Sequence, residues 1–174
     1  MSAARKPVIV RKLTRDWCAG YAAANPASGI AGDGEELELL DMHGKMLRLA
    51  WNQVKWVCYV RELGVGDGSA TDTVNPERLL RRRFPNRPRM AGLWLRLGLS
   101  DGEELEGVAA NDRTLIEGAG LMLTPPDTRS NTQRVYVPRT SIRDLTVLGV
   151  IGAAGPVRHP EGLQPELFEK GIEG

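Results

Sequence analysis

Residues 93–107 read Leu-Trp-Leu-Arg-Leu-Gly-Leu-Ser-Asp-Gly-Glu-Glu-Leu-Glu-Gly and predict a β-hairpin. The four leucines at 93, 95, 97 and 99 alternate with other residues, which is the pattern of a strand with one buried face. Asp101-Gly102 follows as a turn, because this dipeptide tolerates the positive φ that a tight hairpin needs. In the return strand, Gly107 would let the backbone bend sharply, as in a small barrel.

The same pattern occurs earlier in the chain. Residues 13–23 align with 99–110, residues 37–40 with 121–124, and residues 47–55 with 135–143. Each block has few identities, but the three blocks keep the same order, which indicates a duplicated unit. Each copy contains about five short strands and a short turn before the last one.

We therefore predict an all-β protein of two tandem small five-stranded barrels joined by a short basic α-helix. The expected divisions are residues 1–63 for the first barrel, 64–90 for a Gly-rich linker and an Arg-rich helix, 91–152 for the second barrel, and 153–174 for an extended or weakly helical tail. Asn75-Pro76-Glu77 is a favourable helix start, and we expect that helix to run from Glu77 to about Phe84.

Composition excludes several classes of protein. The 174 residues are 41% hydrophobic and carry 23 Lys and Arg against 22 Asp and Glu, which is too apolar for a disordered chain. No apolar run approaches the roughly 18–20 residues that span a bilayer, and the first residues do not resemble a signal peptide. The two cysteines, Cys18 and Cys58, predict reduced thiols and a cytoplasmic protein.

Arginines are concentrated in one segment. Seven of them and no acidic residue lie between Arg78 and Arg96, whereas acids dominate the hairpin that follows. Guanidinium groups can hold two phosphate oxygens at once, so this segment is a candidate ligand site. Alternatively, its arginines pair with the acidic hairpin of the same molecule. The candidate side chains here are Arg78, Arg82, Arg83, Arg87 and Arg89.

A second candidate site is the polar loop 124–134. Its Arg129, Asn131 and Arg134 could contact a ligand or could simply stabilise a turn. Trp94 faces away from the leucine row, and we predict that it lies in an interface.

The sequence contains no recognisable catalytic, metal or cofactor motif. His43 falls in a predicted turn and His159 in the tail, and neither position would hold a general base. No spacing of Cys and His resembles a zinc site. We therefore expect no enzyme, no cofactor and no metal.

Two families resemble parts of the chain. Residues 47–61 and 121–139 are similar to an uncharacterised bacterial family with Sm-like or SH3-like barrels, and residues 95–123 resemble the first Sm motif. Sm-like proteins bind RNA through an Asn or Asp before the third strand and an Arg-Gly pair after the fourth. Asn111 and Asp112 match the first feature, whereas Val137-Pro138-Arg139-Thr140 has no Arg-Gly pair.

The second resemblance is to PilZ domains, which bind cyclic di-GMP through an Arg-x-x-x-Arg segment and an Asp-x-Ser-x-x-Gly motif. Arg83 and Arg87 match the spacing of the first motif. Asp112 and Thr114 stand where the second would begin, with Gly118 one residue late. The resemblance implies a dinucleotide ligand held by these four side chains.

The sequence as a whole predicts a non-enzymatic binding or adaptor module in a protein assembly. Its contacts would come from the arginine segment (residues 78–89) and from the 124–134 loop. The alternative is a phosphate-rich ligand, either RNA or cyclic di-GMP. A protein partner is expected, and the sequence leaves a homo-oligomer open.

Overall fold

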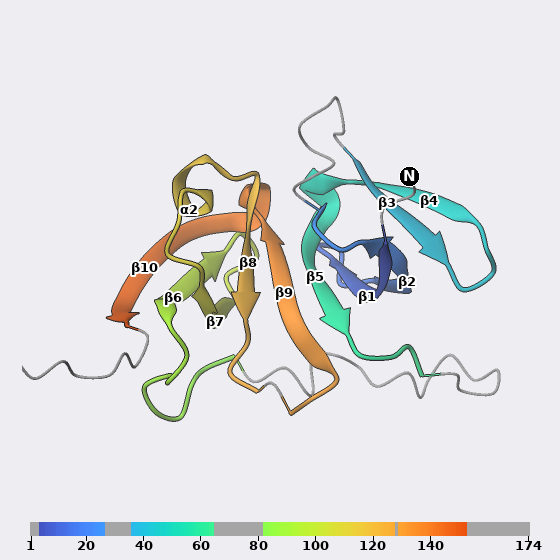
Figure 1. The fold of residues 1–174 in the computed structure, drawn as a ribbon. Helices are drawn as coiled ribbons and strands as arrows, with labels where there is room; N and C mark the ends of the chain where they lie inside the picture. The colour runs from blue at the N-terminus through green and yellow to red at the C-terminus, as the bar shows by residue number, and fades with distance from the viewer. Residues whose placement is uncertain (1–3, 27–35, 65–81, 128, 153–174) are drawn as a thin grey trace, which may run out of the picture.

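The chain folds into ten antiparallel strands. The computed structural model describes residues 4–26, 36–64, 82–127 and 129–152 (Figure 1). The first five strands are β1 (Arg5–Lys12), β2 (Trp17–Ala23), β3 (Glu36–Asp41), β4 (Met46–Ala50) and β5 (Val54–Val60). The second five are β6 (Gly92–Leu99), β7 (Glu104–Ala109), β8 (Gly120–Thr124), β9 (Thr132–Pro138) and β10 (Ile142–Ile151). The prediction of an all-β protein is confirmed.

All ten strands belong to one sheet, in the order β10-β6-β7-β8-β9-β5-β1-β2-β3-β4. We call β1–β5 the first half and β6–β10 the second half. In each half the fifth strand pairs with the first, and the other strands follow in sequence order. The halves are joined where β9 pairs with β5, and we call this pairing the junction.

The two halves also share their registers. Leu37 pairs with Leu49 in the first half, and Leu121 pairs with Val137 in the second. Residues 37–40 and 121–124 had been aligned from the sequence alone, as had 47–55 and 135–143. The aligned residues therefore occupy equivalent places in the hydrogen-bond ladder.

The first turn of each half is built in the same way. The Arg15 N–H donates to the Lys12 carbonyl at 3.1 Å, and the Gly102 N–H donates to the Leu99 carbonyl at 3.0 Å. Both turn residues have positive φ, +72° for Arg15 and +87° for Gly102. Glycine adopts this conformation without strain, whereas arginine does not. The Asp-Gly turn predicted from the sequence is thus present, and its counterpart in the first half holds an arginine.

Short 3₁₀ helices precede the last strand of each half, where the sequence predicted a short turn. They are η2 (Trp51–Gln53) and η3 (Arg139–Ser141). The Leu13 N–H donates to the Gln53 carbonyl at 2.9 Å, and the Ser100 N–H donates to the Ser141 carbonyl at 2.9 Å. Each 3₁₀ helix is therefore tied to the first turn of its own half by an equivalent bond.

The core extends across the junction. All seven residues of β5 are buried. Strands β9 and β1 pair with it on either side, and both of its faces are covered. Trp56 and Cys58 of β5 belong to the same apolar cluster as Leu95, Leu97 and Val137 of the second half. A second cluster holds most of the core of the first half, and it includes Tyr136 of β9. Each half therefore has its own apolar cluster, and each cluster also takes in residues from across the junction. Cys18 and Cys58 form no disulfide.

The structure differs from the expectations about helices at two places. Residues 77–81 of the predicted basic helix lie outside the described residues, and residues 82–84 are not helical. Phe84 is instead tied to β7, because its N–H donates to the Glu106 carboxylate at 3.1 Å. A helix that the sequence did not predict, α2 (Thr114–Glu117), lies between β7 and β8. In the described parts of the chain, no helix has the length and apolar character needed to cross a membrane.

Candidate functional site

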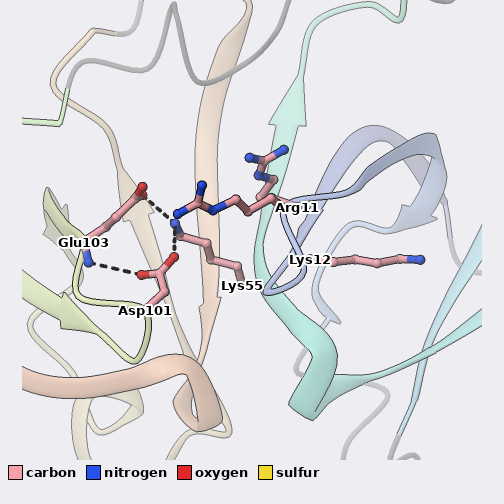
Figure 2. A pocket seen from close by; sticks show the side chains of 6 residues that line it. Arg11, Lys12, Lys55, Asp101 and Glu103 are labelled. Atoms are coloured by element: carbon pink, nitrogen blue, oxygen red, sulfur yellow. Dashed lines mark hydrogen bonds and ion pairs between the residues drawn. The ribbon is translucent and has the colours of Figure 1, made fainter.

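A pocket of about 170 Å³ lies beside the junction, and charged side chains line it (Figure 2). The first half contributes four cationic residues from β1, the β1–β2 turn and β5, and the second half contributes two acids from the β6–β7 turn. We call this site the basic pocket, and its residues are Arg11, Lys12, Arg15, Lys55, Asp101 and Glu103.

Lys55 is the buried member of the basic pocket. Its side chain is only 3% exposed, and its ammonium forms ion pairs with Asp101 and, at 2.5 Å, with Glu103. The same ammonium lies 4.6 Å from the centre of the Trp56 ring. A buried ammonium needs such partners, because its desolvation is otherwise very unfavourable. Figure 2 shows Lys55 directed toward these two acids, whereas Lys12 extends away from them.

Both carboxylates of the pocket already have cationic partners. Burial acts to raise the pKa of Asp101, but the hydrogen bond from Lys55 and the backbone N–H of Glu103 outweigh it, so the pKa lies below its ordinary value. Glu103 also lies 3.3 Å from a guanidinium nitrogen of Arg82. The acids of the pocket are therefore shared between Lys55 and Arg82. Four cations against two carboxylates leave the lining positively charged.

A second charged centre is built on Glu106 of β7, which is 3% exposed. Arg96 donates to its carboxylate from Nε at 3.2 Å and from Nη2 at 2.8 Å. The Trp94 indole N–H donates to the same carboxylate at 3.3 Å, and the Phe84 ring meets the Trp94 ring edge-on at 6.3 Å. Trp94, which the sequence assigned to an interface, is thus half-buried beneath Phe84.

Three of the four described arginines of the arginine segment contact other residues of the same chain. Arg82 pairs with Glu103, and Arg83 pairs with Glu104 at 2.6 Å. Arg87 donates to the Val150 carbonyl at 3.0 Å, whereas Arg89 is exposed. Pairing with the acidic hairpin of the same molecule was one of the two alternatives raised by the sequence. Arg78 lies outside the described residues.

Asp112 and Thr114 contact each other at the start of α2. The Thr114 N–H and hydroxyl both donate to the Asp112 carboxylate, at 2.9 and 2.5 Å. These bonds hold the pKa of Asp112 below its ordinary value. In the described part of the chain they do not join Arg83 or Arg87, which the PilZ resemblance grouped with them.

In the 124–134 loop, Asn131 has a structural role. Its side-chain oxygen accepts the Arg61 N–H at 3.1 Å, and its amide donates to the Glu62 carbonyl at 2.8 Å. These bonds fasten the loop to the end of β5. The Arg129 N–H donates to Asp127 at 3.0 Å, and Arg134 is exposed on β9.

The comparisons with known proteins identify the chain at the level of its family. A model for a family of unknown function, DUF6982, matches residues 4–149. The chain belongs to this family. No curated protein and no solved structure matches it. The matched residues of this DUF6982 member include nine of its strands in full and all six residues of the basic pocket.

Sequence reasoning missed the cationic residues of the basic pocket. One signal was present, since Lys55 interrupts the otherwise apolar run Val54–Val60. A lysine in a buried strand implies an acidic partner, but the sequence did not show which acidic residue that partner would be. In the described residues, no group of three or more His, Cys, Asp or Glu side chains could hold a metal ion.

Proposed function

We propose that this protein is a non-enzymatic binding module, acting as an adaptor in a protein assembly, and that it recognises an acidic segment of its partner. The observation that carries this proposal is the excess of cations over acids in the basic pocket. Lys55 and Arg82 occupy the two carboxylates, which leaves Lys12 of β1 and Arg15 of the β1–β2 turn to attract a further anion. The arginine segment joins this surface through Arg82.

The acidic partner would dock across both halves. Lys12 and Arg15 come from the first half, and the acids that fix Lys55 come from the second. Recognition therefore depends on the intact junction, as expected for a surface that was formed by joining two units. The exposed Arg129 and Arg134 could extend the contact along the 124–134 loop.

The second candidate is a phosphate-rich ligand, either RNA or cyclic di-GMP. The observation in its favour is that Arg11 and Arg15 both line one pocket, because guanidinium groups bind phosphate oxygens in pairs. Binding of nucleic acid releases counterions, so its affinity would fall steeply with salt.

For the fold, we propose that each half is a small Sm-like or SH3-like barrel. The equivalent strand orders and registers support this reading. So do Gly20 and Gly107, at corresponding places in β2 and β7. A Cβ on Gly20 would lie 2.3 Å from the Leu40 carbonyl oxygen, and one on Gly107 would lie 2.8 Å from the Leu123 Cβ. Only glycine permits such close approach, which a tightly curved strand requires.

Fluorescence anisotropy on the full chain tests the function. The probes are a labelled glutamate-rich peptide, an oligoribonucleotide and labelled cyclic di-GMP. We expect the peptide to bind, and its affinity to fall about tenfold when one contacting cation is removed by Lys12→Gln or Arg15→Gly. Arg113→Gln serves as the matched control. Arg113 is exposed and does not line the basic pocket, so this change should leave the affinity unchanged.

Each outcome of this titration decides between the proposals. Binding of the nucleotide probes alone, with loss in the same two variants, would replace the acidic protein partner by a phosphate-rich ligand. If none of the three probes binds, or if Arg113→Gln weakens binding as much as Arg15→Gly does, the basic pocket is not a recognition site.

A further inference from the structure

The two strands at the ends of the sheet are the counterparts of the two strands that meet at the junction. Inside the chain, the fourth strand of the second half (β9) pairs with the fifth strand of the first half (β5). The sheet ends in the fourth strand of the first half (β4) and the fifth strand of the second half (β10). These edges lie at opposite sides of the molecule (Figure 1). Each edge strand is therefore the counterpart of one of the two strands that already pair at the junction.

The registers specify how the two edges would fit together. At the junction, Tyr59 pairs with Arg134. Their counterparts in the other halves are Val147 and Met46, by the matched registers of the two halves. Val147 and Met46 are both large apolar residues at sheet edges, 48% and 41% exposed. A pairing that repeats the junction would place these two side chains opposite each other and cover both.

The charges at the two edges are also complementary. At the junction, Lys55 of β5 pairs with Glu103 of the β6–β7 turn. The counterpart of Lys55 is Arg143, and the counterpart of Glu103 is Asp16, because the Asp16 carbonyl accepts from Lys12 as the Glu103 carbonyl accepts from Leu99. Arg143 pairs with the neighbouring Asp144 at 2.8 Å within the chain. A repeated junction would bring the same guanidinium to the Asp16 carboxylate, in the place where the junction has an ammonium and a carboxylate.

The β10 edge has the features of a strand that pairs with another chain. It is ten residues long and exposes Val147 and Val150, the latter by 59%. Long exposed edges with apolar side chains are normally avoided, because they add strands from other molecules. A contact between two different edges is heterologous, so it produces closed rings or open filaments of chains.

We infer that copies of this chain associate head to tail, with β4 of one copy adding to β10 of the next and repeating the junction between the halves. The occupant of each edge is a second copy of the chain, because the chain itself contains the complementary strand in a matched register. This inference concerns residues outside the basic pocket and does not depend on the ligand proposed there.

Sedimentation velocity on the full chain over a range of concentrations tests the inference. The wild-type chain is expected to form species larger than a monomer as its concentration rises. Met46→Lys and Val147→Lys should each weaken this association by about tenfold or more, because a charged side chain at an edge opposes strand addition. Ile116→Lys is the matched control, since Ile116 is an apolar residue 82% exposed on α2 and belongs to neither edge strand.

A mixing experiment distinguishes head-to-tail pairing from pairing of like edges. The Met46→Lys chain keeps its β10 edge, and the Val147→Lys chain keeps its β4 edge. Each alone should be monomeric, and an equal mixture should form a two-chain complex that does not grow further. If either variant alone still forms dimers as readily as the wild type, like edges pair and the inference is wrong.

A charge exchange tests the same contact without altering the apolar residues. Asp16→Arg and Arg143→Asp should each weaken association, and the double variant should restore it. Circular dichroism of each variant would show whether the fold is retained. A wild-type chain that stays monomeric at all accessible concentrations would overturn the inference. So would a double variant that remains as weak as the single ones.

Discussion

Arg15 adopts a backbone conformation that suits glycine better than arginine. Its φ is +72°, and Gly102 occupies the equivalent turn position with φ of +87°. We predict that Arg15→Gly raises the free energy of unfolding by up to about 1 kcal/mol, because it relieves left-handed strain. Gly102→Ala should lower it by about 1 kcal/mol for the opposite reason.

Urea denaturation measures both changes. A loss of stability in Arg15→Gly would show that the arginine side chain contributes more than its backbone costs. The expected gain also makes this variant useful in the binding test, since reduced affinity would not then come from unfolding.

Two buried tyrosines differ in one hydrogen bond. The Tyr59 hydroxyl donates to the Ala23 carbonyl at 2.7 Å, whereas the buried Tyr136 hydroxyl has no hydrogen-bond partner among the described residues. Burial raises the pKa of both phenols, that of Tyr136 to about 12, so both are neutral at ordinary pH. Tyr59→Phe should cost about 1 kcal/mol, and Tyr136→Phe should be neutral or stabilising. Equal losses in thermal or urea unfolding would contradict this account.

At the scale of elements, Glu106 connects β7 to β6 and to the segment that precedes β6. Burial acts to raise the pKa of its carboxyl, but hydrogen bonds from Arg96, Phe84 and Trp94 outweigh it, so the pKa lies below its ordinary value. A group with a lowered pKa in the folded state stabilises the protein above its unfolded-state pKa. That stabilisation is lost as the pH falls through the folded-state value.

We therefore predict that Glu106→Gln lowers the free energy of unfolding by about 2 kcal/mol at pH 7. The difference from the wild type should shrink as the pH falls below about 4.5. Urea denaturation at several pH values measures it. A difference that stays constant down to pH 3 would show that the ionisation of Glu106 does not contribute.

The strands could be predicted from the sequence because their signal is local. Leu93, Leu95, Leu97 and Leu99 alternate, and all four are buried. The basic helix was predicted from Asn75-Pro76-Glu77 and from favourable composition, but residues 82–84 are not helical. There, the Glu106 N–H donates to the Arg82 carbonyl at 2.7 Å and the Glu106 carboxylate accepts from Phe84. These long-range bonds override the local propensity.

At the scale of the whole molecule, the two apolar clusters both cross the junction, and this predicts one cooperative unfolding transition. Leu97 of the second half and Trp56 of the first are buried in the same cluster. Leu97→Ala should therefore destabilise both halves together, by about 2–5 kcal/mol. Trp94→Phe leaves tryptophans only in the first half, so their fluorescence reports on that half and the junction, while circular dichroism reports on the whole sheet. Separate fluorescence and dichroism midpoints in the Leu97→Ala, Trp94→Phe chain would show that the halves unfold independently.

The sequence by itself determined the strands, the turn at Gly102 and the correspondence between the two halves, because alternation and turn chemistry depend on near neighbours. Only the tertiary structure decided that the halves share one sheet, and that Lys55 meets Glu103, which lies 48 positions away along the chain. A lysine within a buried strand shows that an acid must be nearby. Its identity follows from which strand edges pair, and that choice depends on packing across the whole molecule.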